Sequence, residues 1–170
     1  GKWHLSGTAY FDNGICPPGW DPKYWYDGKC WLEDLTKAER NLLKKLKSPD
    51  DIHKYEAGEE ITYGHRVSDR AISFLEEHSS ESPFFLVVSY DEPHGPFICP
   101  PPFCDMFRDF EYKLGENVRD PLINKPEHQR EWAEYYNLPR DKKTLKHPMY
   151  FGCNSFVDYE IGRVLDAVDT

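Results

Sequence analysis

Apolar residues recur at helical spacing in four stretches of this chain, and capping residues mark where two of these stretches begin. Thr36 and Glu39 form a capping-box pattern at the start of the first stretch, whose leucines make a single stripe. Thr62 stands where an N-cap residue would open the second stretch. The spacing predicts helices over residues 36–47, 63–78 and 126–136, and a last helix that begins at Pro148.

The last helix has the clearest pattern, because its apolar and charged residues separate onto two faces. The apolar face is predicted to be buried and the charged face to point outward. The predicted buried residues are Val157, Ile161, Val164, Leu165 and Val168, and the predicted outward residues are Asp158, Glu160, Arg163 and Asp166.

One short run, Phe84 to Tyr90, is apolar at nearly every position instead of every third or fourth. This pattern is typical of a central strand in a parallel sheet that is covered on both faces. A helix followed by such a strand is half of a β-α-β unit, so the sequence predicts an α/β protein.

The remaining stretches are polar and rich in turn dipeptides. They predict a long surface loop over 6–31, an irregular segment over 49–61 and a loop-rich stretch over 95–147. Aromatic side chains in the first loop either line a sugar-stacking pocket or form a small core beneath the loop, and both interpretations stay open. These residues are Trp20, Tyr24, Trp25 and Trp31.

Composition narrows the possible partners. The 170-residue chain carries a net charge of −9, which disfavours a nucleic-acid partner because the phosphate backbone would be repelled. No apolar run approaches the ~18 residues of a spanning helix, so no membrane partner is predicted. A small anionic ligand remains compatible with this charge, since a few local cations outweigh a distant net charge.

The five cysteines give no disulfide framework and no Cys-x-x-Cys motif. His94, Cys99 and Cys104 are the one group with loosely metal-like spacing. The prolines between them stiffen the segment, so we predict no zinc site there.

Three residues are candidates for chemistry on an anion. Lys2 and His4 are two apart, so in extended backbone they point to the same face and present a fixed cation and a titratable base together. A structural alternative leaves Lys2 in solvent and packs His4 beside Trp3. His94 follows the predicted strand, where α/β folds bind ligands, and Asp91 and Glu92 are neighbours able to keep it protonated. The other histidines, at positions 53, 65, 78, 128 and 147, are predicted to be surface residues.

These segments resemble the sulfatase family of the alkaline-phosphatase-like superfamily. Gly1-Lys2-Trp3-His4-Leu5 is similar to the second sulfatase signature, with Ser6 in place of the usual Gly. Pro93-His94-Gly95-Pro96-Phe97 after a strand is a second match, and the helical segment 156–165 is a third. The resemblance implies an α/β fold in which a few parallel strands, flanked by helices, form part of the alkaline-phosphatase-like core.

The resemblance also implies an activity. Sulfatases hydrolyse sulfate esters with a formylglycine nucleophile and a calcium ion. On that pattern Lys2 binds the sulfate, His4 acts as a base, and His94 contacts the ester oxygen of an aryl or sugar sulfate. The same superfamily contains phosphomonoester and phosphonate ester hydrolases, which is a second possibility, and a non-catalytic binding module with a degenerate site is a third.

The departures from the family pattern are equally informative. The chain has no Cys/Ser-x-Pro-x-Arg motif for formylglycine, and it lacks the aspartate and asparagine motifs that hold calcium. We therefore expect the chain to be an internal fragment of a larger catalytic domain, in which residues 6–61 and 104–147 are loop-rich insertions. We also expect that this fragment has no cofactor site of its own and is inactive alone. A fragment with an incomplete sheet exposes strand edges, so it is a candidate for homodimerisation.

Overall fold

The computed structural model describes residues 13–78, 82–136 and 142–169, and these form two compact units. The larger unit combines the N-terminal part of the chain up to Arg108 with the segment from Pro148 onward. The smaller unit spans Asp109–His147. Lys2 and His4 lie outside the described residues.

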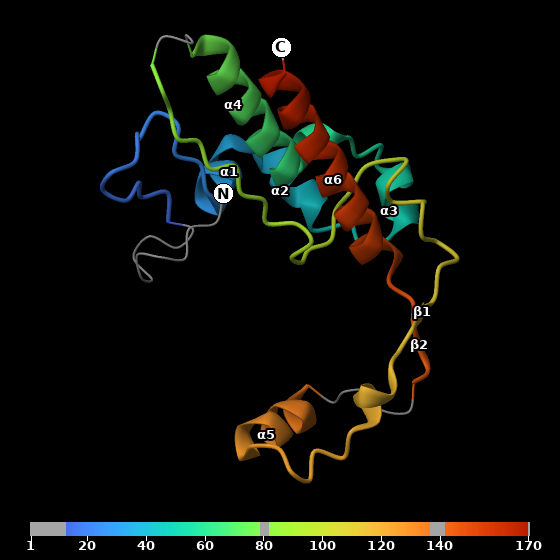
Figure 1. Cartoon of the computed structure of the whole chain (residues 1–170). Coiled ribbons are helices and arrows are strands. Elements are labelled where there is room, and N and C mark those ends of the chain that lie inside the picture. Colours follow the sequence, from blue (N-terminus) through green and yellow to red (C-terminus); the bar gives the residue numbers. More distant parts are fainter. Residues whose placement is uncertain (1–12, 79–81, 137–141, 170) are drawn as a thin grey trace. The chain divides into compact units, whose positions relative to one another are not determined.

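The larger unit is built from helices (Figure 1). The long helices α4 (Tyr63–Glu77) and α6 (Pro148–Val168) pack against each other, although they are far apart in the sequence. The remaining elements are short: α1 (Gly28–Asp34), α2 (Lys37–Leu43), α3 (Pro49–Lys54) and the 3-10 helix η2 (Glu59–Ile61).

Side-chain caps begin the four helices α1 to α4 of the larger unit. The predicted capping box is confirmed, because Thr36 accepts from the Glu39 amide at 3.2 Å and its own amide donates to the Glu39 carboxylate. The Thr62 hydroxyl accepts from the His65 amide and begins α4 as predicted. Two further caps were not predicted: Asp27 begins α1 and Ser48 begins α3. The expectation of loop at 28–31 and of irregular chain at 49–54 was therefore wrong.

The smaller unit contains the helix α5 (Glu127–Tyr135), the 3-10 helix η3 (Glu116–Arg119) and two short strands. Strands β1 (Tyr112–Lys113) and β2 (Thr144–Leu145) pair antiparallel, with Tyr112 opposite Leu145. The helix predicted over 126–136 is confirmed within one residue at each end.

The main core of the larger unit lies where α6 approaches α2, α3 and the segment 98–104. The α6 backbone comes so close to this segment that a Cβ on Gly152 would lie 2.5 Å from the Phe103 carbonyl oxygen. The fully buried side chains of this core include Leu46, Ile52, Cys99, Cys104, Cys153 and Phe156.

Two predictions about buried faces were wrong. The segment 84–90 lies in neither a helix nor a strand, and Phe85 is 81% exposed. On α6 the buried face is rotated from the predicted one: Ile161 and Leu165 are exposed, whereas Glu160 is fully buried. The reason is that α4 and the segment 98–104 contact α6 along the stripe Met149, Gly152, Cys153, Phe156, Glu160 and Val164.

Candidate functional site

The loop 91–97 presents His94 at the surface, with its side chain 67% exposed. The His94 amide donates to the Asp91 carbonyl oxygen at 2.9 Å, which closes a turn. The ring Nδ1 lies 2.8 Å from the Gly95 carbonyl oxygen, which accepts only hydrogen bonds, so this contact requires a proton on Nδ1. Within the described residues, Nε2 has no hydrogen-bond partner. The loop thus fixes the ring and directs Nε2 away from its own backbone contacts.

Glu92 anchors this loop to the first turn of α4. Its Oε1 accepts from the Gly64 amide at 2.8 Å, one of the amides that a helix N-terminus leaves without an internal partner. Burial raises the pKa of the Glu92 carboxyl above its ordinary value, although the Gly64 bond acts in the opposite direction. Glu92 therefore serves to dock the loop, while the Asp91 carboxylate lies 4.0 Å from His94 Nδ1.

A narrow cavity of about 40 Å³ lies beneath His94, between the loop and the start of α4. Asp91, Glu92, Trp31 and Tyr63 are among the residues that line it. This volume admits about one water-sized group. A ligand larger than a water molecule therefore does not fit into this cavity.

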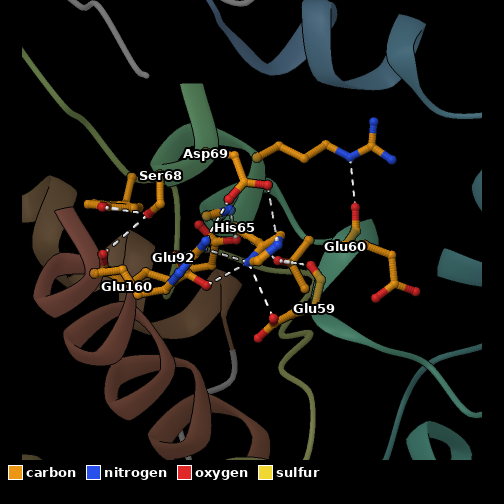
Figure 2. A network of polar contacts seen from close by, with 12 residues as sticks. Glu59, Glu60, His65, Ser68, Asp69, Glu92 and Glu160 are labelled. Atoms are coloured by element: carbon orange, nitrogen blue, oxygen red, sulfur yellow. Dashed lines mark hydrogen bonds and ion pairs between the residues drawn. The ribbon is translucent and has the colours of Figure 1, made fainter. Parts of the chain in front are cut away.

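The helix to which the loop is docked is itself joined to α6 by a buried charge network. Figure 2 shows Glu160 of α6 pointing toward His65 of α4. Glu160 Oε1 lies 2.9 Å from His65 Nδ1, and Glu160 Oε2 accepts from Arg163 Nη1 at 2.7 Å. Arg163 Nη2 donates to Asp69 at 2.7 Å, and Ser68 donates to the Glu160 carbonyl oxygen. The network positions α4, and with it the anchor of the His94 loop.

The protons in this network are tightly constrained. Arg163 Nη1 also lies 2.9 Å from His65 Nδ1, so Nδ1 either accepts from Arg163 or donates to Glu160, and never both at once. Burial lowers the pKa of the Arg163 guanidinium, but its bonds to Asp69 and Glu160 raise the pKa overall. Arg163 is therefore the permanent cation that compensates the buried Glu160 carboxylate.

Sequence reasoning missed both His65 and Glu160. His65 was expected at the surface, but its side chain is only 11% exposed. The available signal was position: Glu160 follows Phe156 by four residues and precedes Val164 by four, which places it on the buried stripe. Asp69 at i+4 from His65 was a further hint of a partnered histidine.

The aromatic residues of the first loop divide between the two interpretations. Trp31 belongs to the protein interior, since its Nε1 donates to the Ile61 carbonyl oxygen at 3.2 Å and its ring contacts Tyr63 edge-on. Trp20, Tyr24 and Trp25 instead line a cavity of about 930 Å³, together with α4 and residues 84–89. A pocket that stacks on a sugar therefore remains a prediction for these three residues.

Two groups of side chains in the described residues have metal-ligand types close together. Glu59, His65 and Glu160 form one, but the Arg163 guanidinium already occupies its charge-compensating position. His53, Cys104 and Asp105 form the other. Burial and the Asp105 carboxylate raise the pKa of the Cys104 thiol to about 12. Neither group is the all-oxygen set that calcium prefers, because each contains a histidine.

The structure does not assemble the cysteines as their spacing in sequence suggested. Cys104 lies beside His53, not beside His94, and Cys99 lies beside Cys153 of α6. The hydrogen bond with Cys153, reinforced by burial, raises the pKa of the Cys99 thiol.

Among the described residues, no helix combines the length and apolarity that crossing a membrane requires.

Comparison with known proteins gives a consistent result. The family model described as Sulfatase matches residues 1–170. The chain is 47% identical over 171 residues to the uncharacterized sulfatase YidJ of Escherichia coli K12, covering 99% of this chain and 34% of that protein. It is 30% identical over 110 residues to an arylsulfatase of Clostridium perfringens, covering 60% of this chain and 22% of that protein. Human iduronate 2-sulfatase is 29% identical over 118 residues, which cover 60% of this chain and 22% of that enzyme. No solved structure matches.

Proposed function

Because this chain belongs to the sulfatase family, with its alkaline-phosphatase-like fold, we propose that it supplies one wall of an active site that hydrolyses sulfate esters. The chain spans about a third of the length of YidJ and less of the other relatives, so the activity is proposed for the full-length protein that contains it. The observation that carries the proposal is the exposed His94, whose Nδ1 is held by its own loop and whose Nε2 has no hydrogen-bond partner among the described residues.

His94 is suited to contact the ester oxygen. With Nδ1 protonated by virtue of its bond to Gly95, a protonated ring donates from Nε2 to a leaving alcohol and a neutral ring accepts there. Lys2 is proposed to bind the sulfate group and His4 to act as a base. These two residues lie outside the described part of the chain, so their roles rest on the family motif.

Formylglycine and calcium supply the nucleophile and the Lewis acid in this family, but the residues of this chain do not fit either group. The sequence has no Cys/Ser-x-Pro-x-Arg, since Cys16-Pro17-Pro18 and Cys99-Pro100-Pro101 both lack the arginine. The described acidic clusters include nitrogen ligands that calcium disfavours. The 170-residue chain alone is therefore proposed to be inactive, and turnover of a sulfate ester by the purified chain would contradict this.

The test is His94→Asn in the full-length protein, assayed with an aryl sulfate and with the corresponding aryl phosphate. We expect kcat for the sulfate to fall by about 10²- to 10⁴-fold, the range for loss of a general acid or base. His128→Ala is the matched control, because His128 is exposed on α5 in the smaller unit. An unchanged kcat in His94→Asn sinks the assignment, and a preference for the phosphate moves the protein to the phosphate or phosphonate ester hydrolases. Binding of the substrate without turnover by the wild-type protein would favour a binding module.

A further inference from the structure

We infer that His53, Cys104 and Asp105 form a binding site for a divalent transition-metal ion of the zinc class. Three different ligand atoms converge there from two segments of the larger unit. His53 Nε2 lies 2.7 Å from Asp105 Oδ2, and Cys104 Sγ lies 3.6 Å from Asp105 Oδ2 and 4.0 Å from His53 Nε2. This mixture of thiolate, imidazole and carboxylate is the ligand chemistry of zinc and cobalt.

The distances can be compared with a tetrahedral ion. Zinc–ligand bonds of about 2.3 Å to sulfur and 2.0–2.2 Å to nitrogen and oxygen place the ligands about 3.6 Å (S to N), 3.6 Å (S to O) and 3.4 Å (N to O) apart. The sulfur–oxygen separation of 3.6 Å already agrees, and the sulfur–nitrogen separation of 4.0 Å is slightly long. The 2.7 Å hydrogen bond from His53 to Asp105 must lengthen by roughly 0.7 Å, and the sulfur–nitrogen separation must shorten by roughly 0.4 Å. A rotation of the half-exposed His53 ring supplies this.

The surrounding contacts hold the ligands in place. Arg108 Nε donates to the other oxygen of Asp105, Oδ1, at 2.6 Å, which fixes the carboxylate and leaves Oδ2 for the ion. Arg108 Nη1 also donates to Asp50 Oδ1 at 2.7 Å on α3, the helix that carries His53. One arginine therefore bridges the two ligating segments, a supporting role that metal sites commonly require.

The three ligating side chains differ in their exposure to solvent. Cys104 is fully buried in the main core, whereas the side chains of His53 and Asp105 are 50% and 34% exposed. A metal ion at this position binds a thiolate from the interior and keeps its fourth position toward water. With Cys104 and Asp105 ionised, the ligands carry two negative charges and neutralise a divalent ion.

The experiment is titration of the purified chain with Co²⁺, a coloured probe for zinc sites. We expect one equivalent to bind, with a thiolate-to-cobalt charge-transfer band, and Zn²⁺ to displace it. Cys104→Ser should abolish the band, and His53→Ala should weaken Co²⁺ binding by at least about tenfold, since loss even of a supporting residue costs 10–100-fold. Cys16→Ser and His128→Ala are the matched controls, since both residues lie outside the cluster.

Three outcomes would overturn the site: no stoichiometric binding by the wild-type chain, a charge-transfer band that survives in Cys104→Ser, or equal binding by His53→Ala and His128→Ala. His53→Ala keeps the test valid even where Cys104→Ser disturbs the core, because half of the His53 side chain is in solvent. Far-ultraviolet circular dichroism of each variant verifies its fold. The readout is metal binding, so it is independent of the proposed sulfatase activity.

Discussion

Replacing Glu160 by glutamine tests the buried network that joins α4 to α6. The change removes one negative charge from a fully buried position and leaves the shape of the side chain intact. Arg163 loses its charged partner at 2.7 Å, and the side chain 2.9 Å from His65 Nδ1 becomes a neutral amide. Breaking a buried ion pair from one side costs about 3–5 kcal/mol. Because Arg163 is a quarter exposed and keeps Asp69 at 2.7 Å, we expect the lower end, about 3 kcal/mol.

This magnitude is measurable by two methods. For a chain of this size, 1 kcal/mol shifts the melting temperature by about 2–4 °C, so Glu160→Gln should melt about 6–12 °C below wild type. Urea unfolding followed by circular dichroism should show a lower midpoint with an unchanged slope. Asp158→Asn is the matched control, since it makes the same carboxylate-to-amide change on an exposed position of the same helix and should stay within about 0.5 kcal/mol. If the two variants unfold within 1 kcal/mol of each other, Glu160 does not stabilise the α4–α6 contact as argued.

Substitutions also test three further features of the structure. Gly152→Ala should destabilise the chain by about 1–3 kcal/mol, because the added Cβ meets the Phe103 carbonyl oxygen at 2.5 Å. Gly162→Ala has open space on the same helix and should stabilise the chain by up to about 1 kcal/mol. Equal urea midpoints for the two variants would contradict the close approach at Gly152. Asp27→Ala should cost about 2 kcal/mol in the same assay, since Asp27 accepts from the amides of Gly14, Lys29 and Cys30, and Asp27→Asn should cost less. Burial raises the pKa of Asp27, but these hydrogen bonds lower it overall. The contribution of Asp27 to the free energy of unfolding is therefore complete above the ordinary aspartate pKa and is lost as the pH falls through the lowered pKa of the folded state. If stability falls with decreasing pH in the same way in wild type and in Asp27→Asn, this account is wrong. Glu92→Gln should gain stability relative to wild type as the pH rises from 4 to 7, because the raised pKa of Glu92 means that its ionisation opposes folding; a pH-independent difference would argue against it.

The sequence predicted elements well where their determinants are local. The N-caps Thr36 and Thr62 make hydrogen bonds to residues three positions away, so a short window contains both partners. Ser48 caps α3 in the same way, but the polar composition of the segment concealed it. These caps satisfy amides of the first helical turn, which is why they mark the helix starts so reliably.

The segment 84–90 shows the limit of this reasoning. Its apolar composition predicts burial on two faces, but a strand also needs neighbouring strands that donate and accept its backbone hydrogen bonds. Among the described residues no strand pairs with it, and Phe84 and Val87 are about half exposed. The composition of the segment indicates that it is suited to a buried strand. Whether neighbouring strands pair with it depends on the fold of the whole chain and cannot be read from the segment alone.

The buried charges were missed for a related reason. Glu160 is stabilised by His65 and Asp69-bound Arg163, and the first of these lies 95 positions away in the sequence. Periodicity assigns a glutamate to the solvent face because an unpaired buried carboxylate is costly. Arg163 lies three residues along the same helix, but only the packing of α6 on α4 adds His65 and Asp69 to the network. For His94, the segment 84–90 that precedes it is not the predicted strand, and the role implied by the motif remains a prediction.

The pairing of β1 with β2 has a consequence for how this chain can vary in length. Lys113 and Thr144 are opposite each other, and the Leu114 amide donates to the Lys143 carbonyl oxygen at 2.9 Å, so the smaller unit begins and ends at one point. The chain enters the smaller unit through β1 and ends it through β2, so the residues between these paired strands form a loop with adjacent ends. Residues can be gained or lost within 114–143 while the distance between the two ends stays the same. Insertions and deletions between the two strands therefore leave the pairing of β1 with β2 intact.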